Sequence, residues 1–465
     1  MDATSRTATD SGVFSSTTQL AYAIRSGHLS AREVLDAHLA QIATHNPVLN
    51  AVVTLDAERA SERAREADEA LARGEKWGPL HGVPFTLKDA HATARVRTTT
   101  GFPPLADYVP KEDGTVAARL KAAGGILIGK TNVPVMLADF QTSNPIFGRT
   151  NNPWDTARTA GGSSGGAAAA LASGMTPFEI GTDLSASIRL PAHFCGVFGL
   201  KPTERRVPLT GLIPGLPGPR PLRIMSSIGP MARSVEDLAL LYAIIAGPDG
   251  RDTEVPPVPV EEPAHVDLRD VRVAVMPGFP SIPVAAEIRA ADSQLAQRLA
   301  PVCRAVDEAA PPALDFNQEL ARAGALVGMA IGAVQPGGQE PPVALTQYLD
   351  ALDRRDQSIV AWEQFFDQWD VLLCPPAPVT AFPHCDPGTP LRVDDQEVAY
   401  WTVSAYGAPF NYTGHPAIVL PFTGDRDGLP IGIQLVGKRW HESRLLAVAG
   451  AIAEVTGGYQ RPPGY

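Results

Sequence analysis

Hydrophobic positions follow two spacings along the chain, and their alternation predicts its secondary structure. After Ser30 the apolar residues recur at helical spacing, and Ser30 with Glu33 forms a capping box at the start of this segment. Short continuous apolar runs at 83–87 and 126–128 have the pattern of buried strands. We expect further helices at 57–73, 117–123, 165–172, 285–302 and 442–455, and further strands at 178–180, 271–275, 371–373 and 431–436. Strands that alternate with helices indicate an α/β sheet that is at least partly parallel.

The domain organisation follows from length and from the breaks in this pattern. A chain of 465 residues is long enough for two lobes or for one large domain. Residues 1–15 are polar and predict a disordered leader, and we expect 16–465 to form a single domain. Residues 204–222 are rich in Pro, Gly and Arg and predict a long loop. Residues 310–345 have little regular pattern and begin a variable region, 310–410, that we expect to form a pocket wall or lid.

The composition indicates which partners and which cellular compartment to expect. The formal net charge of −11 argues against nucleic acid or an anionic membrane as the main partner. The longest apolar runs are too short to span a bilayer. The four cysteines are far apart and form no C-x-x-C pair, so they predict neither a zinc site nor a disulfide framework. We therefore expect a cytoplasmic protein.

The stretch 159–203 contains the most conspicuous small-residue pattern. Gly161 to Gly165 matches G-x-S-x-G around Ser163, the nucleophile elbow of α/β-hydrolases. That motif requires an apolar strand before it, and the residues before Gly161 are typical of a loop. The elbow is therefore a weak alternative, and the stretch also lacks the phosphate-binding G-x-x-x-x-G-K-[ST] pattern.

Two side chains near predicted strand ends are candidates for chemistry. Lys88 follows an apolar strand, where burial would lower its pKa enough for it to act as a base; a solvated lysine paired with Asp89 is the structural alternative. Ser187 follows another predicted strand, where backbone amides could converge on an oxyanion. His81 and His193 flank these segments, so a Ser-His pair stays open at this point.

Four ordered motifs carry a resemblance to a known family. They are GVPFTLKD, NNPWDTARTAGGSSGG, GTDLSASIRLPAHFCGVFGLKPT and IGPMARSVEDLALL, and HPAIVLPF and DGLPIGIQLVG follow near the C-terminus. Together they resemble the amidase signature family, with a signature core over about 80–241. The resemblance implies a three-layer α/β/α fold with a large mixed β-sheet and inserted helices.

The same resemblance implies a catalytic triad. Ser187 is the implied nucleophile, Ser163 the bridging serine held by a cis peptide, and Lys88 the general base. A serine hydroxyl needs a base to attack an amide, and a neutral buried lysine is able to supply it through the second hydroxyl.

The segment around the implied nucleophile departs from the family in one respect. The implied oxyanion hole consists of the backbone N–H groups of Leu184, Ser185, Ala186 and Ser187. Thr182, Asp183 and Arg189 match the motif as residues that hold the loop rather than perform chemistry. Ser185-Ala186 stands where the family usually has Gly-Gly, and a Cβ restricts the backbone there. This change bears on substrate preference and rate more than on reaction class.

The function that we expect is that of a serine amidohydrolase. It would cleave a carboxamide or anilide C–N bond through an acyl-enzyme, and the same machinery would accept esters or carbamates (urethanes). The alternative is a glutamine-hydrolysing subunit of a tRNA-dependent amidotransferase. A binding protein with the glycine stretch as a linker would require Lys88, Ser163 and Ser187 to be present by accident.

The expected partners and cofactors follow from this function. We expect a small-molecule amide, ester or carbamate substrate, no nucleic acid and no membrane, with a homodimer left open. No metal or organic cofactor is implied.

Overall fold

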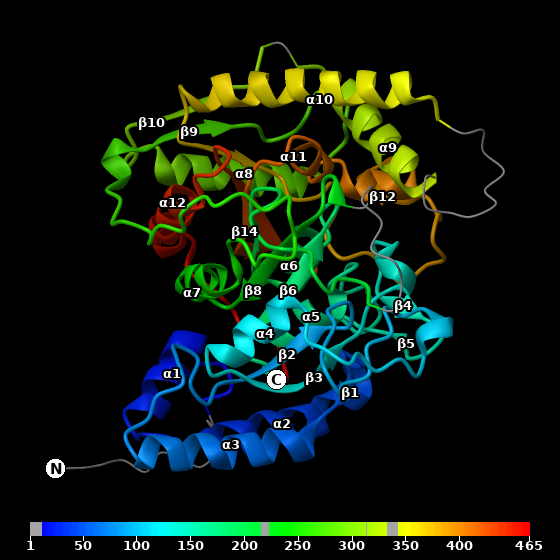
Figure 1. The fold of residues 1–465 in the computed structure, drawn as a ribbon. Helices are drawn as coiled ribbons and strands as arrows, with labels where there is room; N and C mark the ends of the chain where they lie inside the picture. Colours follow the sequence, from blue (N-terminus) through cyan, green and yellow to red (C-terminus); the bar gives the residue numbers. More distant parts are fainter. Residues whose placement is uncertain (1–11, 215–222, 313, 333–342) are drawn as a thin grey trace.

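A three-stranded sheet and an eight-stranded sheet organise the chain (Figure 1). The structure is a computed structural model that describes residues 12–214, 223–312, 314–332 and 343–465. The small sheet has the order β1-β3-β2, in which β2 is parallel to β3 and β1 is antiparallel to it. Its strands are β1 (Val52–Leu55), β2 (Pro84–Lys88) and β3 (Ile126–Thr131).

The large sheet is mixed. Its strands are β6 (Glu179–Asp183), β7 (Phe198–Lys201), β8 (Ser227–Ala232), β9 (Arg272–Val275), β10 (Ala305–Glu308), β11 (Val371–Cys374), β14 (Ala417–Gly424) and β15 (Pro430–Val436). They follow the order β10-β9-β11-β15-β14-β7-β8-β6. Only the pairs of β9 with β10 and with β11 are parallel among the described strands of this sheet. Two short hairpins, β4 (Ser143–Asn144) with β5 (Gly148–Arg149) and β12 (Leu391–Val393) with β13 (Gln396–Val398), lie outside both sheets.

Helix α5 (Gly165–Ala172) joins the two sheets. All eight of its residues are buried, and the helix contacts β2 and β3 of the small sheet and β6 and β8 of the large one. Its small residues permit this close packing: a Cβ atom on Gly166 would lie 2.4 Å from the backbone nitrogen of Asn132. One hydrophobic cluster runs through both sheets, with Phe85 and Leu420 among its members.

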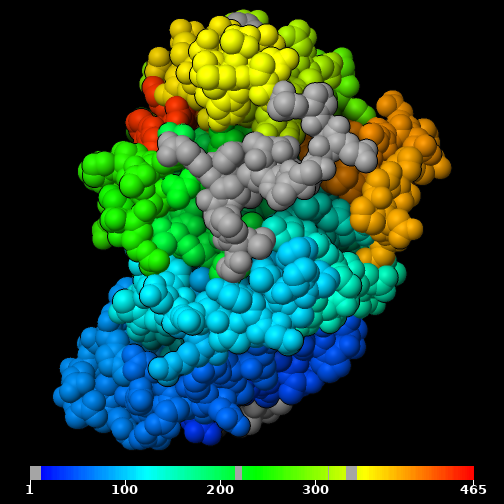
Figure 2. Space-filling view, turned by 45° about the vertical axis from the view of Figure 1, so that its right-hand side comes forward, coloured from blue at the N-terminus to red at the C-terminus, as the bar shows by residue number. Residues whose placement is uncertain are grey.

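The remaining helices pack around the two sheets, and α6 and α11 among them are entirely buried. They are α1 (Thr17–Arg25), α2 (Ala31–Leu49), α3 (Ala57–Ala72), α4 (Thr115–Ala122), α6 (Arg189–Cys195), α7 (Val235–Ile245), α8 (Ala286–Leu299), α9 (Phe316–Gly332), α10 (Leu345–Phe366), α11 (Ala408–Tyr412) and α12 (Glu442–Thr456). Helices α2 and α3 pack on the small sheet, α6 packs on β14 and β15, and α7, α8 and α12 pack on the large sheet and on one another. The space-filling view places the N-terminal helices (blue) and α10 (yellow) at opposite ends of the molecule (Figure 2).

The structure confirms the predicted α/β/α fold with a large mixed sheet. Ser30 caps α2 as predicted: its hydroxyl accepts from the N–H of Glu33, and its own N–H donates to the Glu33 carboxylate. The prediction for 310–345 was wrong over 316–332, which form α9; exposed Gly324 and Gly328 interrupt its apolar pattern.

Some predictions fall on residues outside the described ranges. These are 1–11 of the predicted leader, 215–222 of the predicted loop, and 313 and 333–342 of the predicted variable region. The division into a leader and a single domain therefore stays a prediction. No helix within the described residues combines the length and apolar character needed to cross a membrane.

Candidate functional site

Lys88 is surrounded by hydroxyl groups at the end of β2. Its Nζ atom donates to the hydroxyls of Ser163 (2.8 Å), Ser164 (2.7 Å) and Thr182 (2.8 Å), and the residue is completely buried. A hydroxyl both donates and accepts hydrogen bonds, so this cage suits a neutral amine as well as an ammonium ion. The solvated lysine paired with Asp89 is excluded, because Asp89 instead accepts from the backbone and side chain of Thr99.

Burial also determines the protonation of Lys88. Desolvation lowers its pKa to about 7, against the opposing negative charges of Asp183 and Glu179. A lysine amine that is neutral in part at neutral pH is able to accept a proton. Lys88 therefore has both the surroundings and the protonation state that a general base requires.

Ser163 and Ser187 both lie near the start of α5. The peptide bond between Gly162 and Ser163 is cis, and Ser163 is 1% exposed. The N–H of Ser164 donates to the carbonyl oxygen of Ser187 at 3.2 Å, which holds the Ser187 backbone against the glycine stretch. Ser187 is 7% exposed, so it keeps more contact with solvent than Lys88 or Ser163. The structure thus joins Lys88 to Ser163 through a side-chain hydrogen bond and brings the backbone of Ser187 to the neighbouring Ser164.

The backbone from Leu184 to Ser187 turns sharply after β6. Within the described residues we find no acceptor for the N–H groups of Leu184, Ser185 or Ser187, which leaves them free to bind an anionic oxygen. The N–H of Ala186 is different, because it donates to Oδ1 of Asp183 at 2.9 Å. In this structure Ala186 thus uses its N–H to hold the turn.

Ala186 occupies a backbone conformation that favours glycine. Its φ angle is 78°, and its side chain is buried against Gly407. A Cβ atom on Gly407 would lie 2.4 Å from the Cβ atom of Ala186. The departure from the family's Gly-Gly is therefore accommodated by a glycine on the facing segment.

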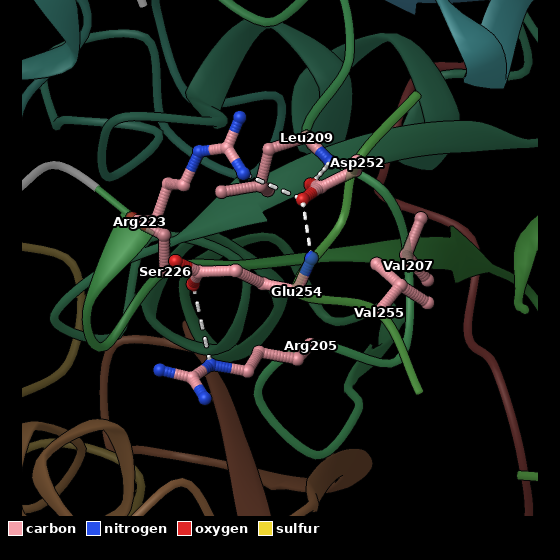
Figure 3. A pocket seen from close by; sticks show the side chains of 8 residues that line it. All are labelled: Arg205, Val207, Leu209, Arg223, Ser226, Asp252, Glu254 and Val255. Carbon is pink, nitrogen blue, oxygen red and sulfur yellow. Dashed lines mark hydrogen bonds and ion pairs between the residues drawn. The ribbon is translucent and has the colours of Figure 1, made fainter. Parts of the chain in front are cut away.

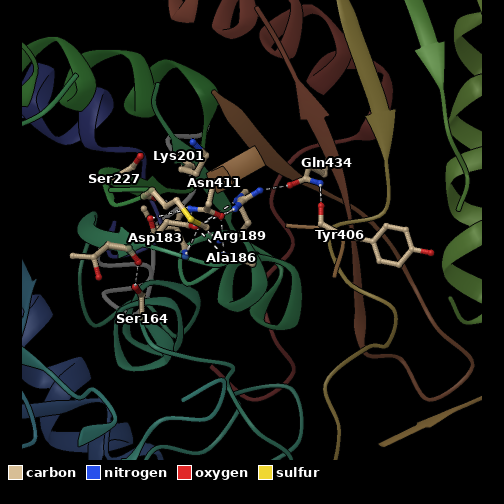
Figure 4. Close-up of polar contacts among 12 residues, drawn as sticks. Ser164, Asp183, Ala186, Arg189, Lys201, Ser227, Tyr406, Asn411 and Gln434 are labelled. Carbon is tan, nitrogen blue, oxygen red and sulfur yellow. Dashed lines mark hydrogen bonds and ion pairs between the residues drawn. The ribbon is translucent and has the colours of Figure 1, made fainter. Parts of the chain in front are cut away.

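A buried ion pair fixes this turn from below. Arg189 donates from Nη2 to Oδ1 of Asp183 at 3.0 Å, and both side chains are fully buried (Figure 4). Arg189 also donates to Gln434 and Asn411, and Asn411 donates to the Asp183 carboxylate. Burial alone would raise the pKa of Asp183, but Arg189 and the neighbouring hydrogen bonds hold this pKa well below its usual range. Asp183 and Arg189 thus lie in the hydrogen-bonded network around the turn, and their holding role stays a prediction; Thr182 instead contacts Lys88 directly.

The histidine alternative is not supported. The ring nitrogens of His193 bond to the carbonyl of Val379 and the N–H of Gly432, and burial lowers its pKa to about 4. The ring of His81 likewise bonds to the backbone of Trp77 and Ala67. Both histidines are structural, and neither ring nitrogen remains for a serine.

Sequence reasoning missed three contributors to this site. Ser164 shares Lys88 with Ser163, Asn411 completes the Asp183 network, and Glu179 is buried inside β6. A signal existed for Glu179, because a lone acidic residue interrupts the apolar run before Gly181. No such signal marks Asn411, which lies more than two hundred residues away in sequence.

A small surface hollow is lined by a different set of residues. Figure 3 shows its lining by Arg205, Val207, Leu209, Arg223, Ser226, Asp252, Glu254 and Val255. Arg223 is paired with Asp252 and Arg205 with Glu254, so its charges are largely neutralised within the protein. No group of three His, Cys, Asp or Glu side chains arranged for a metal ion occurs in the described part of the chain.

The chain is also similar to known proteins. The family profile described as Amidase matches residues 33–335 and 337–446. The A subunit of glutamyl-tRNA(Gln) amidotransferase from Roseiflexus sp. (strain RS-1) is 36% identical over 487 aligned positions, which cover 95% of this chain and 96% of the relative.

Two solved structures are similar throughout. 6-Aminohexanoate cyclic dimer hydrolase has a TM-score of 0.82 at 28% identity, covering 97% of this chain and 99% of its own. A bacterial aryl acylamidase of the amidase signature enzymes has a TM-score of 0.83 at 25% identity, covering 95% and 96%.

These comparisons correct the predicted partners. We expected a small-molecule substrate without nucleic acid, with a homodimer left open. The Roseiflexus relative is named as one subunit of a glutamyl-tRNA(Gln) amidotransferase, so the expectation was wrong in excluding nucleic acid and in naming no partner beyond a homodimer. Net charge averages over the whole surface, so it does not decide which macromolecule reaches one site of a multi-chain enzyme.

Proposed function

Because the chain belongs to the amidase signature family, we propose that it is an amidohydrolase that uses Ser187 as its nucleophile. The observation that carries this proposal is the hydrogen bond of 2.8 Å from buried Lys88 to Ser163. It supports a proton path from the Ser187 hydroxyl through Ser163 to the lysine amine. A hydrogen bond from the Ser187 hydroxyl to that of Ser163 is part of this proposal.

The proposed reaction has two halves. In the first, the Ser187 oxygen bonds to the amide carbon while its proton passes through Ser163 to the Nζ atom of Lys88. The N–H groups of Leu184, Ser185 and Ser187 stabilise the negative charge on the carbonyl oxygen. The C–N bond then breaks, and the proton on Lys88 returns through Ser163 to the departing nitrogen. Water cleaves the resulting ester in the second half, with Lys88 again as the base, to give the carboxylic acid and the free serine.

For the substrate, we propose the carboxamide of glutamine, with this chain as the hydrolysing component of a tRNA-dependent amidotransferase. The similarity to the Roseiflexus relative over nearly the whole length of both chains supports this choice. In this assignment ammonia leaves the site and is passed to a partner chain that amidates glutamyl-tRNA.

A second candidate is the hydrolysis of an apolar carboxamide or anilide. Leu184, whose N–H belongs to the proposed oxyanion hole, packs its side chain against a buried apolar cluster that includes Ile224, Met225, Leu326 and Tyr412. Such surroundings favour an apolar acyl or aryl group over the charged groups of glutamine. The similarity to an aryl acylamidase agrees with this candidate.

The test separates the mechanism from the substrate. Intact mass after brief exposure to a fluorophosphonate should show one adduct on the wild-type chain and none on Ser187→Ala. An adduct that persists in Ser187→Ala but disappears in Ser163→Ala would overturn the assignment of the nucleophile.

Turnover measurements then distinguish the two candidate substrates. Ammonia release from glutamine, stimulated by the other chains of a tRNA-dependent amidotransferase, supports the first candidate. Cleavage of a nitroanilide without release of ammonia from glutamine supports the second. Loss of either activity in Ser187→Ala by at least about a thousandfold ties it to the proposed site.

A further inference from the structure

Glu179 is a buried acid that the proposed reaction does not use. It lies within β6, four residues before Asp183, and is completely buried. Its Oε2 atom accepts a hydrogen bond from the N–H of Ile180 at 3.1 Å. Its Oε1 atom and the hydroxyls of Thr86 and Thr131 make no hydrogen bond of standard geometry among the described residues, although both hydroxyls face the carboxyl. An incompletely bonded buried carboxyl is costly, so its presence calls for a role.

The surroundings of Glu179 are those of Lys88. Thr86 precedes Lys88 by two positions on β2, and Thr131 is paired with Lys88 in the register of β2 with β3. The hydroxyls of both threonines face the Glu179 carboxyl and favour its ionised form. β2 also packs directly against β6. Glu179 and Lys88 therefore share one buried compartment.

The other charges in this compartment are already paired or distant from the serines. Asp183 also favours the charged form of Lys88, but it is bonded to Arg189 at 3.0 Å. Lys130 of β3 faces Glu179 and Asp89, and its amine is held by the carbonyl of His91 (2.6 Å) and by the Thr93 hydroxyl. The ring of His91 lies close to both lysines, and their positive charges and its burial keep it neutral. Glu179 is thus the acid near Lys88 that has no direct cationic partner in the described residues.

We propose, on the basis of the hydrolysis mechanism above, that Glu179 is a positioning residue that sets how readily Lys88 takes up a proton. An ionised Glu179 carboxylate stabilises the ammonium that forms on Lys88 during acylation. When the Glu179 carboxyl is protonated, its negative charge is absent, and the neutral amine of Lys88 is favoured. No bond to substrate is involved, because Glu179 acts through Lys88.

Glu179 and Lys88 change protonation in the same pH range. Burial raises the pKa of Glu179 to about 7, against the threonine hydroxyls, the N–H of Ile180 and the charge of Lys130. This value lies beside the pKa of about 7 of Lys88. The two groups therefore titrate as a coupled pair rather than independently.

The test is the pH dependence of fluorophosphonate labelling of Ser187, which requires no knowledge of the substrate. The second-order labelling rate of the wild-type chain should rise with pH as Lys88 loses its proton. In Glu179→Gln the midpoint should move to lower pH by about half a unit or more, because the ammonium loses its counter-charge. The rate at high pH should also fall severalfold. Asp292→Asn, which changes a buried carboxyl on α8 outside this compartment, should leave the midpoint unchanged.

A second variant keeps the test decisive if Glu179→Gln does not fold. Thr86→Val removes one hydroxyl that favours the ionised carboxyl, so it should move the midpoint in the same direction by a smaller amount. An unmoved midpoint in a folded variant, or a shift to higher pH, would overturn the role of Glu179 alone. Failure of the wild-type chain to label at any pH would instead overturn the proposed function on which this role rests.

Discussion

Two buried polar regions meet at β6, and they are completed to different degrees. Around Asp183, every charge is bonded: Arg189 faces the carboxylate, and Asn411 and Gln434 take up the remaining donors and acceptors. Around Lys88, the lysine is bonded only to hydroxyls, and Glu179 lacks a partner for one oxygen within the described residues. We call the region around Asp183 the closed network and the region around Lys88 the open region.

The difference separates rigidity from chemistry. A fully bonded ion pair holds its geometry, since removal of either member leaves a buried charge without compensation. Ionisable groups whose hydrogen bonds are incomplete gain or lose a proton more readily, and a base needs this property. The Asp183 region therefore keeps the Ser187 turn in place, while the Lys88 region is suited to move protons.

The largest expected effect comes from opening the closed network. Arg189→Met leaves Asp183 as an uncompensated buried charge and should lower the free energy of unfolding by about 3–5 kcal/mol. Denaturant unfolding followed by circular dichroism measures this change. Arg32→Met, which removes an exposed ion pair with Asp36, should cost less than about 1 kcal/mol. Equal effects of the two substitutions would contradict the comparison.

A smaller effect is expected at Ala186, which packs against Gly407 beside the closed network. Gly407→Ala would place a Cβ atom 2.4 Å from that of Ala186 and 3.3 Å from Nη2 of Arg189, at a cost of about 1–3 kcal/mol in unfolding free energy. Ala186→Gly removes the opposing Cβ and should recover most of this loss in the double variant. The thermodynamic cycle of the four proteins gives the coupling directly. Strictly additive effects would show that the two positions do not share the space.

The smallest expected effect is a pH dependence of the open region. Burial lowers the pKa of Lys88 to about 7, so below this pH the ammonium predominates and no longer accepts a proton. The kcat/KM value should fall by about tenfold for each pH unit below 7, equivalent to about 1.4 kcal/mol per unit. Lys88→Ala should abolish this acidic limb together with most of the activity. A wild-type profile that stays flat from pH 8 to pH 5 would exclude Lys88 as the base.

Local patterns predicted a large part of this molecule. The capping box at Ser30, the apolar run before Lys88 and the run of small residues at 165–172 each depend on neighbours in sequence, and each forms the expected element. The resemblance to the family predicted from the sequence that Lys88, Ser163 and Ser187 belong to one site. Their catalytic roles stay predictions, as do the cytoplasmic location and the acceptance of carbamates.

Contacts between distant segments were not predictable in the same way. Asn411 reaches Asp183 from a short helix near the C-terminus, and Gln434 reaches Arg189 from β15. Neither residue differs in local pattern from an ordinary polar side chain. The space that Gly407 leaves for Ala186 is likewise a property of two facing segments and of neither sequence alone.

The division of the site between two sheets has a consequence for how activity arises. Lys88 ends a strand of the small sheet, Ser187 follows a strand of the large sheet, and Ser163 precedes the helix between them. Neither sheet holds a complete set, so a partly folded chain with one sheet formed carries no assembled hydrolase. The proposed triad is therefore assembled only when the two sheets are packed together through α5.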